Sequence, residues 1–190
     1  MPKQYEFAGL DVPAEAKLDL CQKGLWGLVA RIVRIIEEKY GEEGVQALYD
    51  GIRDWDIHLK NVPAMLSTHG IKPEEASPID LVLKVNNPMD SVSWTFCEKP
   101  QITEEPDRNR IHYKITSCNV AETIREQCPK TCRIIANASY EAQVKASNPN
   151  LKVTHNRFLS EGADACDIYV ERVKPVRKRP TRARCRTTKR

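Results

Sequence analysis

The first third of the chain has the spacing of apolar residues that is typical of helices. One set, which recurs at intervals of three and four, predicts an amphipathic helix that ends near Gly41: Leu25, Leu28, Val29, Ile32, Val33, Ile36 and Tyr40. A second helix is predicted by the same spacing of Val45, Leu48, Tyr49, Ile52, Trp55 and Leu59, and Pro63 is expected to close it. Residues 1–20 show little regular patterning, so we expect an irregular N-terminal segment there.

Four later stretches alternate apolar and polar residues one by one, which is typical of half-buried strands. These are VSWTFC at 92–97, IHYKIT at 111–116, and the segments 151–155 and 166–170. Polar connections rich in turn-forming residues separate the members of each pair. The sequence therefore predicts two hairpins.

Helical segments are expected between and before these hairpins. One short helix is predicted at about 121–127, and Pro129 suits the first position of another that runs to about Ser147. The apolar stretch LVLKV at 81–85 fits either a strand or a short helix. Because hairpins favour antiparallel pairing, we expect an α+β fold in which an antiparallel sheet built from hairpins is covered by helices. We assign it to a single domain over 1–172.

The net charge of +4 hides two regions of opposite sign. Ten Lys or Arg residues and no acidic residue lie between Arg172 and Arg190, so the rest of the chain has 20 basic and 26 acidic residues. With its prolines and few apolar residues, the segment 173–190 is predicted to be a disordered basic tail. Such a tail serves as a solubilising extension or binds a polyanion through its phosphates.

The cellular compartment follows from the apolar runs and the cysteines. No apolar run approaches the roughly 20 residues that cross a bilayer, and acidic residues interrupt the N-terminus where a signal peptide is apolar. We therefore expect a cytoplasmic protein without a membrane partner. In that reducing compartment the 7 cysteines are expected to be buried, catalytic or metal-binding rather than disulfide-bonded.

Three cysteines lie where predicted elements meet. Cys118 follows the strand at 111–116, Cys132 lies in the first turns of the helix after Pro129, and Cys166 begins the last strand. Several interpretations remain open for them. They are buried core residues, or one is a nucleophilic thiolate. Alternatively they bind Zn²⁺, with Cys128 and Cys132 on one helix face and Cys118, His155 or Cys166 completing four ligands. A disulfide between Cys128 and Cys132 is the alternative that a reducing compartment disfavours.

Other candidate residues lie near the last hairpin. His155 shares an alternation face with Leu151 and Val153, so it is expected to point inward beside Cys166 as a core histidine, a base or a metal ligand. Glu161 and Asp164 lie in the turn, where they either bind backbone amides or assist His155 as an orienting group or proton donor.

A longer pattern resembles a known family. The string YKITSCNVAETIRE, followed by Cys132, Asn148-Pro149 and the ending LSEGADACD, is similar to the L-2-amino-thiazoline-4-carboxylic acid hydrolase family over about 113–171. The order of hairpins and helices more distantly resembles the 4-vinyl reductase domains and the related haem-NO-binding fold. Zinc-binding relatives have cysteine where this chain has Phe158.

The resemblance implies a hydrolase that opens a small cyclic amidine- or amide-like substrate through a cysteine-containing site. In that reading the catalytic residues are Cys118, Cys166, His155, Glu161 and Asp164, and Cys118 is the first choice of nucleophile. The alternative is a module that binds a small molecule or zinc without turnover, with Cys118, Cys132 and Cys166 as the metal ligands. The cofactor is accordingly none or Zn²⁺. A small-molecule substrate is the expected partner, and a homodimer is a further arrangement that the sequence allows.

Overall fold

The computed structural model describes residues 13–93, 101–103 and 106–173. A run of helices precedes the first pair of strands, and two more helices precede the second pair, so the predicted α+β class is confirmed. The elements are α1 (Ala14–Arg53), α2 (Asp56–Thr68), η1 (Pro73–Glu75), α3 (Pro78–Leu81), η2 (Val82–Asn86), α4 (Asn87–Ser93), β1 (Gln101–Ile102), β2 (Arg110–Ile115), α5 (Ala121–Gln127), α6 (Thr131–Ser147), β3 (Leu151–Arg157), η3 (Leu159–Glu161) and β4 (Cys166–Arg172). Among the described residues, no helix is long and apolar enough to cross a membrane. The predicted tail lies outside the described residues, apart from Val173.

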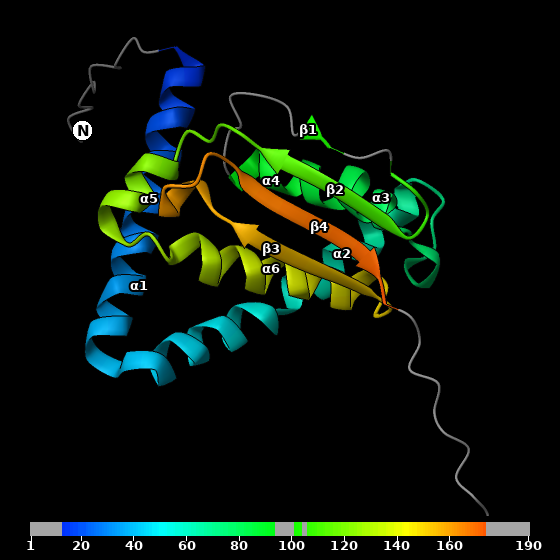
Figure 1. Ribbon diagram of the computed structural model, residues 1–190, viewed down its shortest axis with the longest axis horizontal. Coiled ribbons are helices and arrows are strands. Elements are labelled where there is room, and N and C mark those ends of the chain that lie inside the picture. The colour runs from blue at the N-terminus through cyan, green and yellow to red at the C-terminus, as the bar shows by residue number, and fades with distance from the viewer. Residues whose placement is uncertain (1–12, 94–100, 104–105, 174–190) are drawn as a thin grey trace, which may run out of the picture.

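The sheet has 4 strands in the order β1-β2-β4-β3, and every neighbouring pair is antiparallel. The second predicted hairpin is confirmed, since β3 pairs with β4. The central pair is β2 with β4, which brings Ile115 opposite Cys166. In Figure 1 the helices α2, α3, α4 and α6 lie on one side of the sheet, and α1 with α5 stands beyond one end of it.

The first predicted hairpin is only partly right. Its second strand is β2, but β2 pairs with the short β1 rather than with residues 92–97. Positions 92 and 93 belong to the end of α4, and 94–97 lie outside the described residues. The alternation there misleads because a strand pattern of only a few residues is also compatible with one helical turn.

The ambiguous stretch at 81–85 is helical, and it forms part of a continuous helical run from Pro78 to Ser93. This run widens into a π-turn at Val82–Asn86. Pro88 follows after Asn87, and it lacks the N–H that would bind the carbonyl one α-helical turn earlier, which explains a wider turn at this place. Asn86, at the end of the π-turn, and Asp90, in α4, are both buried in the protein interior.

Helix α1 corrects two expectations. It begins at Ala14, so the segment expected to be irregular is helical over its last residues. Gly41 interrupts α1 with a φ of 61°, a left-handed backbone conformation that glycine adopts without a side-chain clash. The helix expected to end near Gly41 is thus interrupted at that residue, and α1 continues beyond it. The second helix differs more, because it divides at Asp54 and Trp55, and Pro63 lies inside α2 instead of closing it.

The face of α1 that packs on the protein also differs from the prediction. Only Val33 of the predicted apolar set is buried, and the buried face consists of Gln22, Trp26, Ala30 and Val33. Most of the predicted set points away from the domain, with Leu25 at 58% and Leu28 at 57% exposed. Three-and-four spacing identifies a helix correctly, but it does not reveal what covers the apolar face.

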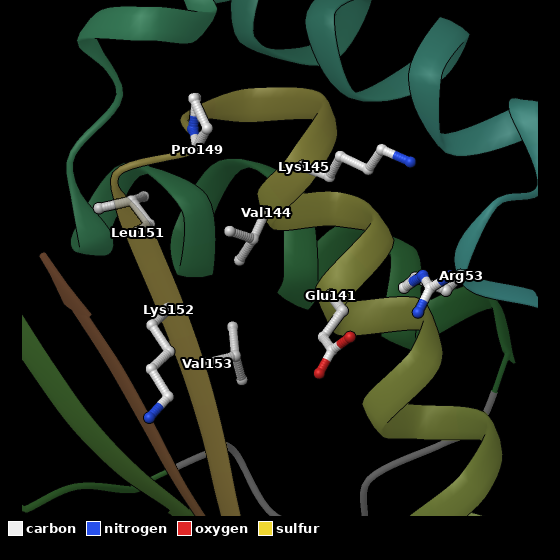
Figure 2. Close-up of a pocket in the computed structure, with 8 residues that line it drawn as sticks. All are labelled: Arg53, Glu141, Val144, Lys145, Pro149, Leu151, Lys152 and Val153. Carbon is white, nitrogen blue, oxygen red and sulfur yellow. The ribbon is translucent and has the colours of Figure 1, made fainter. Parts of the chain in front are cut away.

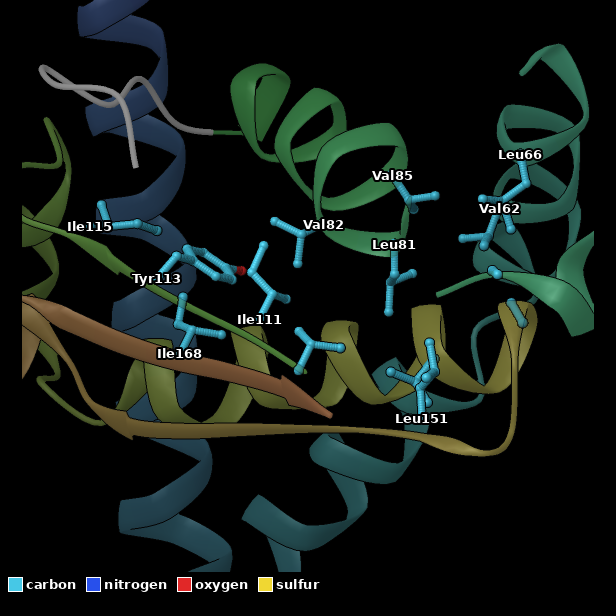
Figure 3. Packing of buried hydrophobic residues seen from close by; sticks show 14 of the residues in the cluster. Val62, Leu66, Leu81, Val82, Val85, Ile111, Tyr113, Ile115, Leu151 and Ile168 are labelled. Carbon is cyan, nitrogen blue, oxygen red and sulfur yellow. The ribbon is translucent and has the colours of Figure 1, made fainter. Parts of the chain in front are cut away.

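The main core lies between the sheet and the helices on one of its sides. Alternate residues of β2 and β4, including Ile111, Tyr113 and Ile168, meet Leu81, Val82 and Val85 from the helical run (Figure 3). A second apolar cluster joins α1 to α5 and α6 and contains Trp26, Ala30, Val33, Val120, Ile124, Cys128 and Ile134. Cys118 contacts both clusters, so it lies where they meet.

The opposite face of the sheet carries a polar group of side chains. Asp167, the last residue of the segment LSEGADACD, points to this face and binds Nε2 of His112 at 2.7 Å. The His112 ring stacks on Tyr169 with 3.9 Å between ring centres. Asp167 therefore supports the outer face of β2 and β4, whereas its neighbour Cys166 points inward.

Asn148 connects the end of α6 to the segment after α2. It is fully buried, and its side-chain amide donates to the carbonyls of Glu74 at 2.9 Å and Ala76 at 3.0 Å, while its oxygen accepts from the backbone N–H of Asn150 at 3.0 Å. The motif Asn148-Pro149 thus has a structural role here.

Replacing Asn148 with Ala should lower the free energy of unfolding by about 2–4 kcal/mol, because it leaves buried backbone groups without partners. Urea denaturation followed by circular dichroism measures the change. Asn150→Ala, at an exposed position two residues away, is the matched control and should be near neutral. Equal effects of the two substitutions would contradict this role for Asn148.

Candidate active site

The three predicted cysteines surround one small cavity. Cys118 reaches it from the connection between β2 and α5, Cys132 from the start of α6, and Cys166 from the start of β4. His155 of β3 lines the same cavity. The remaining lining residues are Ile115, Val120, Ile124, Ala136, Tyr140 and Phe158. Residues that are distant in sequence therefore meet at one end of the sheet, between the two apolar clusters.

A tight turn positions Cys166. The helical turn η3 ends at Gly162, whose φ of 92° reverses the chain in a conformation that favours glycine. The backbone N–H of Leu159 points back at the Cys166 sulfur, at 3.4 Å. Arg125 of α5 donates to the Leu159 carbonyl at 2.6 Å and holds the turn against the helix. The segment LSEGADACD thus forms a turn that places the Cys166 thiol beside the cavity.

A bulge in β3 accompanies the inward orientation of His155. His155 pairs with Ile168, but the next pair joins Arg157 to Asp167, so β3 has one extra residue at this place. Such bulges bend a strand and redirect its side chains. The imidazole lies 4.0 Å from the Phe158 ring and 5.8 Å from the Tyr140 ring, measured between ring centres.

The cavity is poorly solvated, and this controls its acid-base chemistry. Burial raises the pKa of the Cys132 thiol to about 12 and that of the Cys166 thiol to about 11. Both groups are therefore protonated at neutral pH. A thiolate at either position would need an external positive charge, such as a metal ion, to compensate for the lost hydration.

His155 is neutral for the same reason. Burial, together with the positive charge of Arg133, lowers its pKa to about 3. Both ring nitrogens are buried, and neither has a hydrogen-bond partner within the described part of the chain. A buried imidazole without partners is unfavourable unless something binds it. Its low pKa suits it to hydrogen bonding or metal ligation and makes it a weak proton acceptor.

A buried acid lies behind the cavity wall. The Tyr140 hydroxyl donates to Asp90 at 2.6 Å, and both residues are buried. Burial raises the pKa of Asp90 to about 7, although the Tyr140 hydrogen bond acts in the opposite direction. A carboxyl group with this pKa exchanges a proton near neutral pH, which is typical of general acids and bases. Sequence patterns contained no signal for Asp90, which lies in α4 just after the π-turn.

The two predicted acids of the turn lie on the surface and do not line the cavity. Glu161 forms a two-point ion pair with Arg133, with N–O distances of 2.8 and 2.5 Å. Asp164 is 83% exposed and pairs with Arg157 at 3.3 Å. Glu161 is close enough for its charge to contribute to the raised thiol pKa values of Cys132 and Cys166. Its direct role is to neutralise Arg133, which covers the Phe158 ring.

The metal-binding arrangement is not formed in this conformation. In the described ranges, no group of three or more His, Cys, Asp or Glu side chains is close enough to hold a metal ion. Cys128 lies in the second apolar cluster and does not line the cavity. The backbone at Cys128 is extended, so it does not share a helix face with Cys132.

A larger hollow of about 350 Å³ lies between α6 and β3, lined by Arg53, Glu141, Val144, Lys145, Pro149, Leu151, Lys152 and Val153 (Figure 2). None of the predicted site residues contributes to it. Arg53 forms ion pairs with Asp50 and Asp54, and Lys145 also pairs with Asp54, so two carboxylates balance the two cations. We assign the candidate site to the smaller cavity for two reasons. The pKa values of its Cys132, Cys166 and His155 side chains are shifted, and the His155 imidazole has no hydrogen-bond partner among the described residues.

Comparison with protein-family models, with curated proteins and with solved structures found no match to this chain.

Proposed function

We propose that the chain is a cytoplasmic hydrolase that opens a small cyclic amidine- or amide-like substrate, of the 2-amino-thiazoline-4-carboxylate kind, in the cysteine cavity. The observation that carries the proposal is the meeting of three thiols, a neutral unpartnered imidazole and a Tyr–Asp pair at one buried cavity. The resemblance of 113–171 to the L-2-amino-thiazoline-4-carboxylic acid hydrolase family and of the whole arrangement to the 4-vinyl reductase and haem-NO-binding folds supports it.

Cys118 is the nucleophile in this proposal. Cys132 and Cys166 remain protonated because of their burial, which leaves Cys118 as the third thiol of the cavity. Its sulfur adds to the ring carbon that lies between nitrogen and sulfur. The bond from that carbon to a ring heteroatom then breaks, and the departing heteroatom takes up a proton. Water finally attacks the same carbon and releases the Cys118 thiol, so that one water is consumed.

The proton transfers are assigned to the Tyr140–Asp90 pair. Tyr140 lines the cavity and Asp90 lies behind it, so a proton can move from the Cys118 thiol through the tyrosine hydroxyl to the carboxylate and return to the departing heteroatom. A pKa of about 7 allows Asp90 both roles at neutral pH. His155 donates a hydrogen bond to the substrate or accepts one from it, and this bond fixes the orientation of the substrate. The ring nitrogens of His155 are available for it because they have no other partner among the described residues.

The cavity has to widen before a substrate enters. Its volume of about 40 Å³ accommodates a few water molecules, whereas sites for small molecules usually occupy about 300–1,000 Å³. The Phe158 ring and the Arg133–Glu161 pair that covers it form one wall of the cavity. We propose that this wall moves outward when substrate binds.

The three cavity thiols should differ in reactivity. At about pH 7.5, iodoacetamide should label Cys118 at least tenfold faster than Cys132 and Cys166, because burial raises the pKa of the latter two thiols. Peptide mass spectrometry after timed labelling measures each rate separately. Cys21, which is exposed on α1, provides the reference rate of an accessible thiol. Faster labelling of Cys166 than of Cys118 would transfer the role of nucleophile to Cys166.

A binding module without turnover is the second candidate, because the cavity is small and two of its thiols are protonated. In its zinc form, Cys118, Cys132 and Cys166 would rearrange around Zn²⁺, which lowers the pKa of coordinating thiols. Elemental analysis combined with thiol titration separates the candidates. Stoichiometric zinc with three masked thiols would establish the metal-binding module in place of the hydrolase.

A further inference from the structure

Helix α1 carries an apolar stripe that its own domain does not cover. The stripe consists of Leu18, Cys21, Leu25, Leu28, Ile32 and Ile35, and the steps between successive members are three, four, three, four and three residues. The exposed fractions are 52% for Leu18, 58% for Leu25, 57% for Leu28, 45% for Ile32 and 41% for Ile35, and Cys21 is also exposed. This is the a/d repeat of a coiled coil.

The stripe is distinct from the face that holds α1 in the fold. The buried residues of α1 lie on the adjoining side of the helix: Trp26, Ala30 and Val33 pack with residues of α5 and α6, and Gln22 accepts a hydrogen bond from Asn119. A row of large apolar side chains that remains exposed over several turns marks an interaction surface. From this stripe we infer that α1 pairs with α1 of a second copy of this chain, in an antiparallel coiled coil. The inference is independent of the proposed hydrolase activity.

The stripe is complementary to itself when the second helix runs in the opposite direction. In the register with the greatest overlap, Leu18 faces Ile35 of the partner subunit, Cys21 faces the partner's Ile32, and Leu25 faces the partner's Leu28. The same contacts recur on the other side of the two-fold axis, as an isologous interface requires. Each layer then joins an a position to a d position.

The charges beside the stripe favour this direction. The g positions of the heptads are Lys17, Gly24, Arg31 and Glu38. Antiparallel pairing in the same register places Lys17 beside the partner's Glu38 at both ends, and Arg31 beside the partner's Gly24, so that no like charges meet. Glu38 is exposed and forms a surface ion pair with Arg34, which costs little to rearrange.

A parallel pairing is less compatible with the fold. It would align g positions with the partner's e positions, which are Gln22, Val29 and Ile36. Gln22 is buried, and Val29 and Ile36 are partly buried against the chain's own domain. The g edge is the edge left exposed, and only antiparallel pairing brings two g edges together.

The length of the stripe sets the expected strength. From Leu18 to Ile35 the helix rises about 26 Å, at about 1.5 Å per residue. Six layers over this length place the interface near the lower limit of roughly 1,200 Å² for stable complexes. We therefore expect a dimer with a dissociation constant in the micromolar range.

Sedimentation velocity of the full chain over a range of concentrations tests the inference. The native chain should form dimers, and Leu28→Glu should weaken dimerisation at least tenfold, because it buries an unpaired charge in the seam. Leu20→Glu is the matched control, since Leu20 is 66% exposed but lies outside the stripe, and it should dimerise like the native chain. Equal circular dichroism spectra would show that all variants are folded.

Four further variants test the direction of the helices. Lys17→Glu or Glu38→Lys alone should weaken the dimer, and the double variant should restore it, because these residues meet only in the antiparallel arrangement. Ile32→Cys should form a disulfide with the partner's Cys21 under mild oxidation, identified by peptide mass spectrometry. A Cys21–Cys21 crosslink in the native chain would establish a parallel pair and overturn the antiparallel assignment. A native chain that stays monomeric at about 100 µM would overturn the dimer itself.

Discussion

Replacing Cys118 with Ser should lower the turnover of 2-amino-thiazoline-4-carboxylate by roughly a thousandfold or more, because the variant lacks the sulfur that attacks the ring carbon. Serine has nearly the same size, and Cys118 lies at the edge of two apolar clusters, so the fold should persist. The assay follows the thiol or amine released by ring opening. Circular dichroism and the thermal midpoint establish that the variant is folded.

Two comparisons make this result specific to the cavity. Cys21→Ser removes an exposed thiol of α1, outside the cavity, and should leave turnover unchanged. Cys166→Ser changes a cavity thiol that is not the assigned nucleophile, so its effect should be smaller than that of Cys118→Ser. Retention of turnover within tenfold of native in Cys118→Ser would refute covalent catalysis by this residue.

The second large effect concerns stability and pH. Burial raises the pKa of Asp90 from its ordinary value of 3.8 to about 7, so the folded state binds a proton that the unfolded state has released. This contribution to stability is fully present below pH 3.8 and is lost as the pH rises through about 7. Since one pKa unit corresponds to about 1.4 kcal/mol, the free energy of unfolding should decrease by up to about 4 kcal/mol over this range.

Asp90→Asn removes the titrating group and keeps an oxygen that can accept the Tyr140 hydrogen bond. Urea denaturation at several pH values should therefore show a decline in stability for the native chain that is absent from the variant, and above about pH 7.5 the variant should be the more stable of the two. Asp164→Asn changes an exposed carboxylate and should follow the native curve. Parallel curves for native chain and Asp90→Asn would mean that Asp90 titrates in the ordinary range.

Local sequence signals determined several elements of this fold. The short helix at 121–127 is α5, and the helix that ends at Ser147 is α6, which begins two residues after Pro129. The hairpin of β3 and β4 was predicted because both strands alternate and Gly162 closes the turn between them. These elements are predictable because their signals, a proline, a glycine and short periodic runs, act within a few residues.

The site was accessible to sequence reasoning only where its residues lie at element ends. Cys118, Cys132 and Cys166 were singled out because they occupy such junctions, and the structure brings them to one cavity. Asp90 and Tyr140 had no comparable signal. Their proximity depends on the contact of the π-turn with α6 and on the following helix α4, which bring together positions 50 residues apart in the sequence.

Helix α1 separates most clearly what the sequence determined from what the tertiary structure decided. Three-and-four spacing established that residues 25–40 form an amphipathic helix, because this periodicity follows from backbone geometry alone. Which side of that helix enters the domain was decided by the shapes of α5 and α6, which accept Trp26, Ala30 and Val33. Ala30 allows a close approach of helices on the buried face, whereas the leucines of the stripe remain exposed. Periodicity in the sequence indicates that a helix has an apolar face, and only packing in three dimensions determines which surface covers that face.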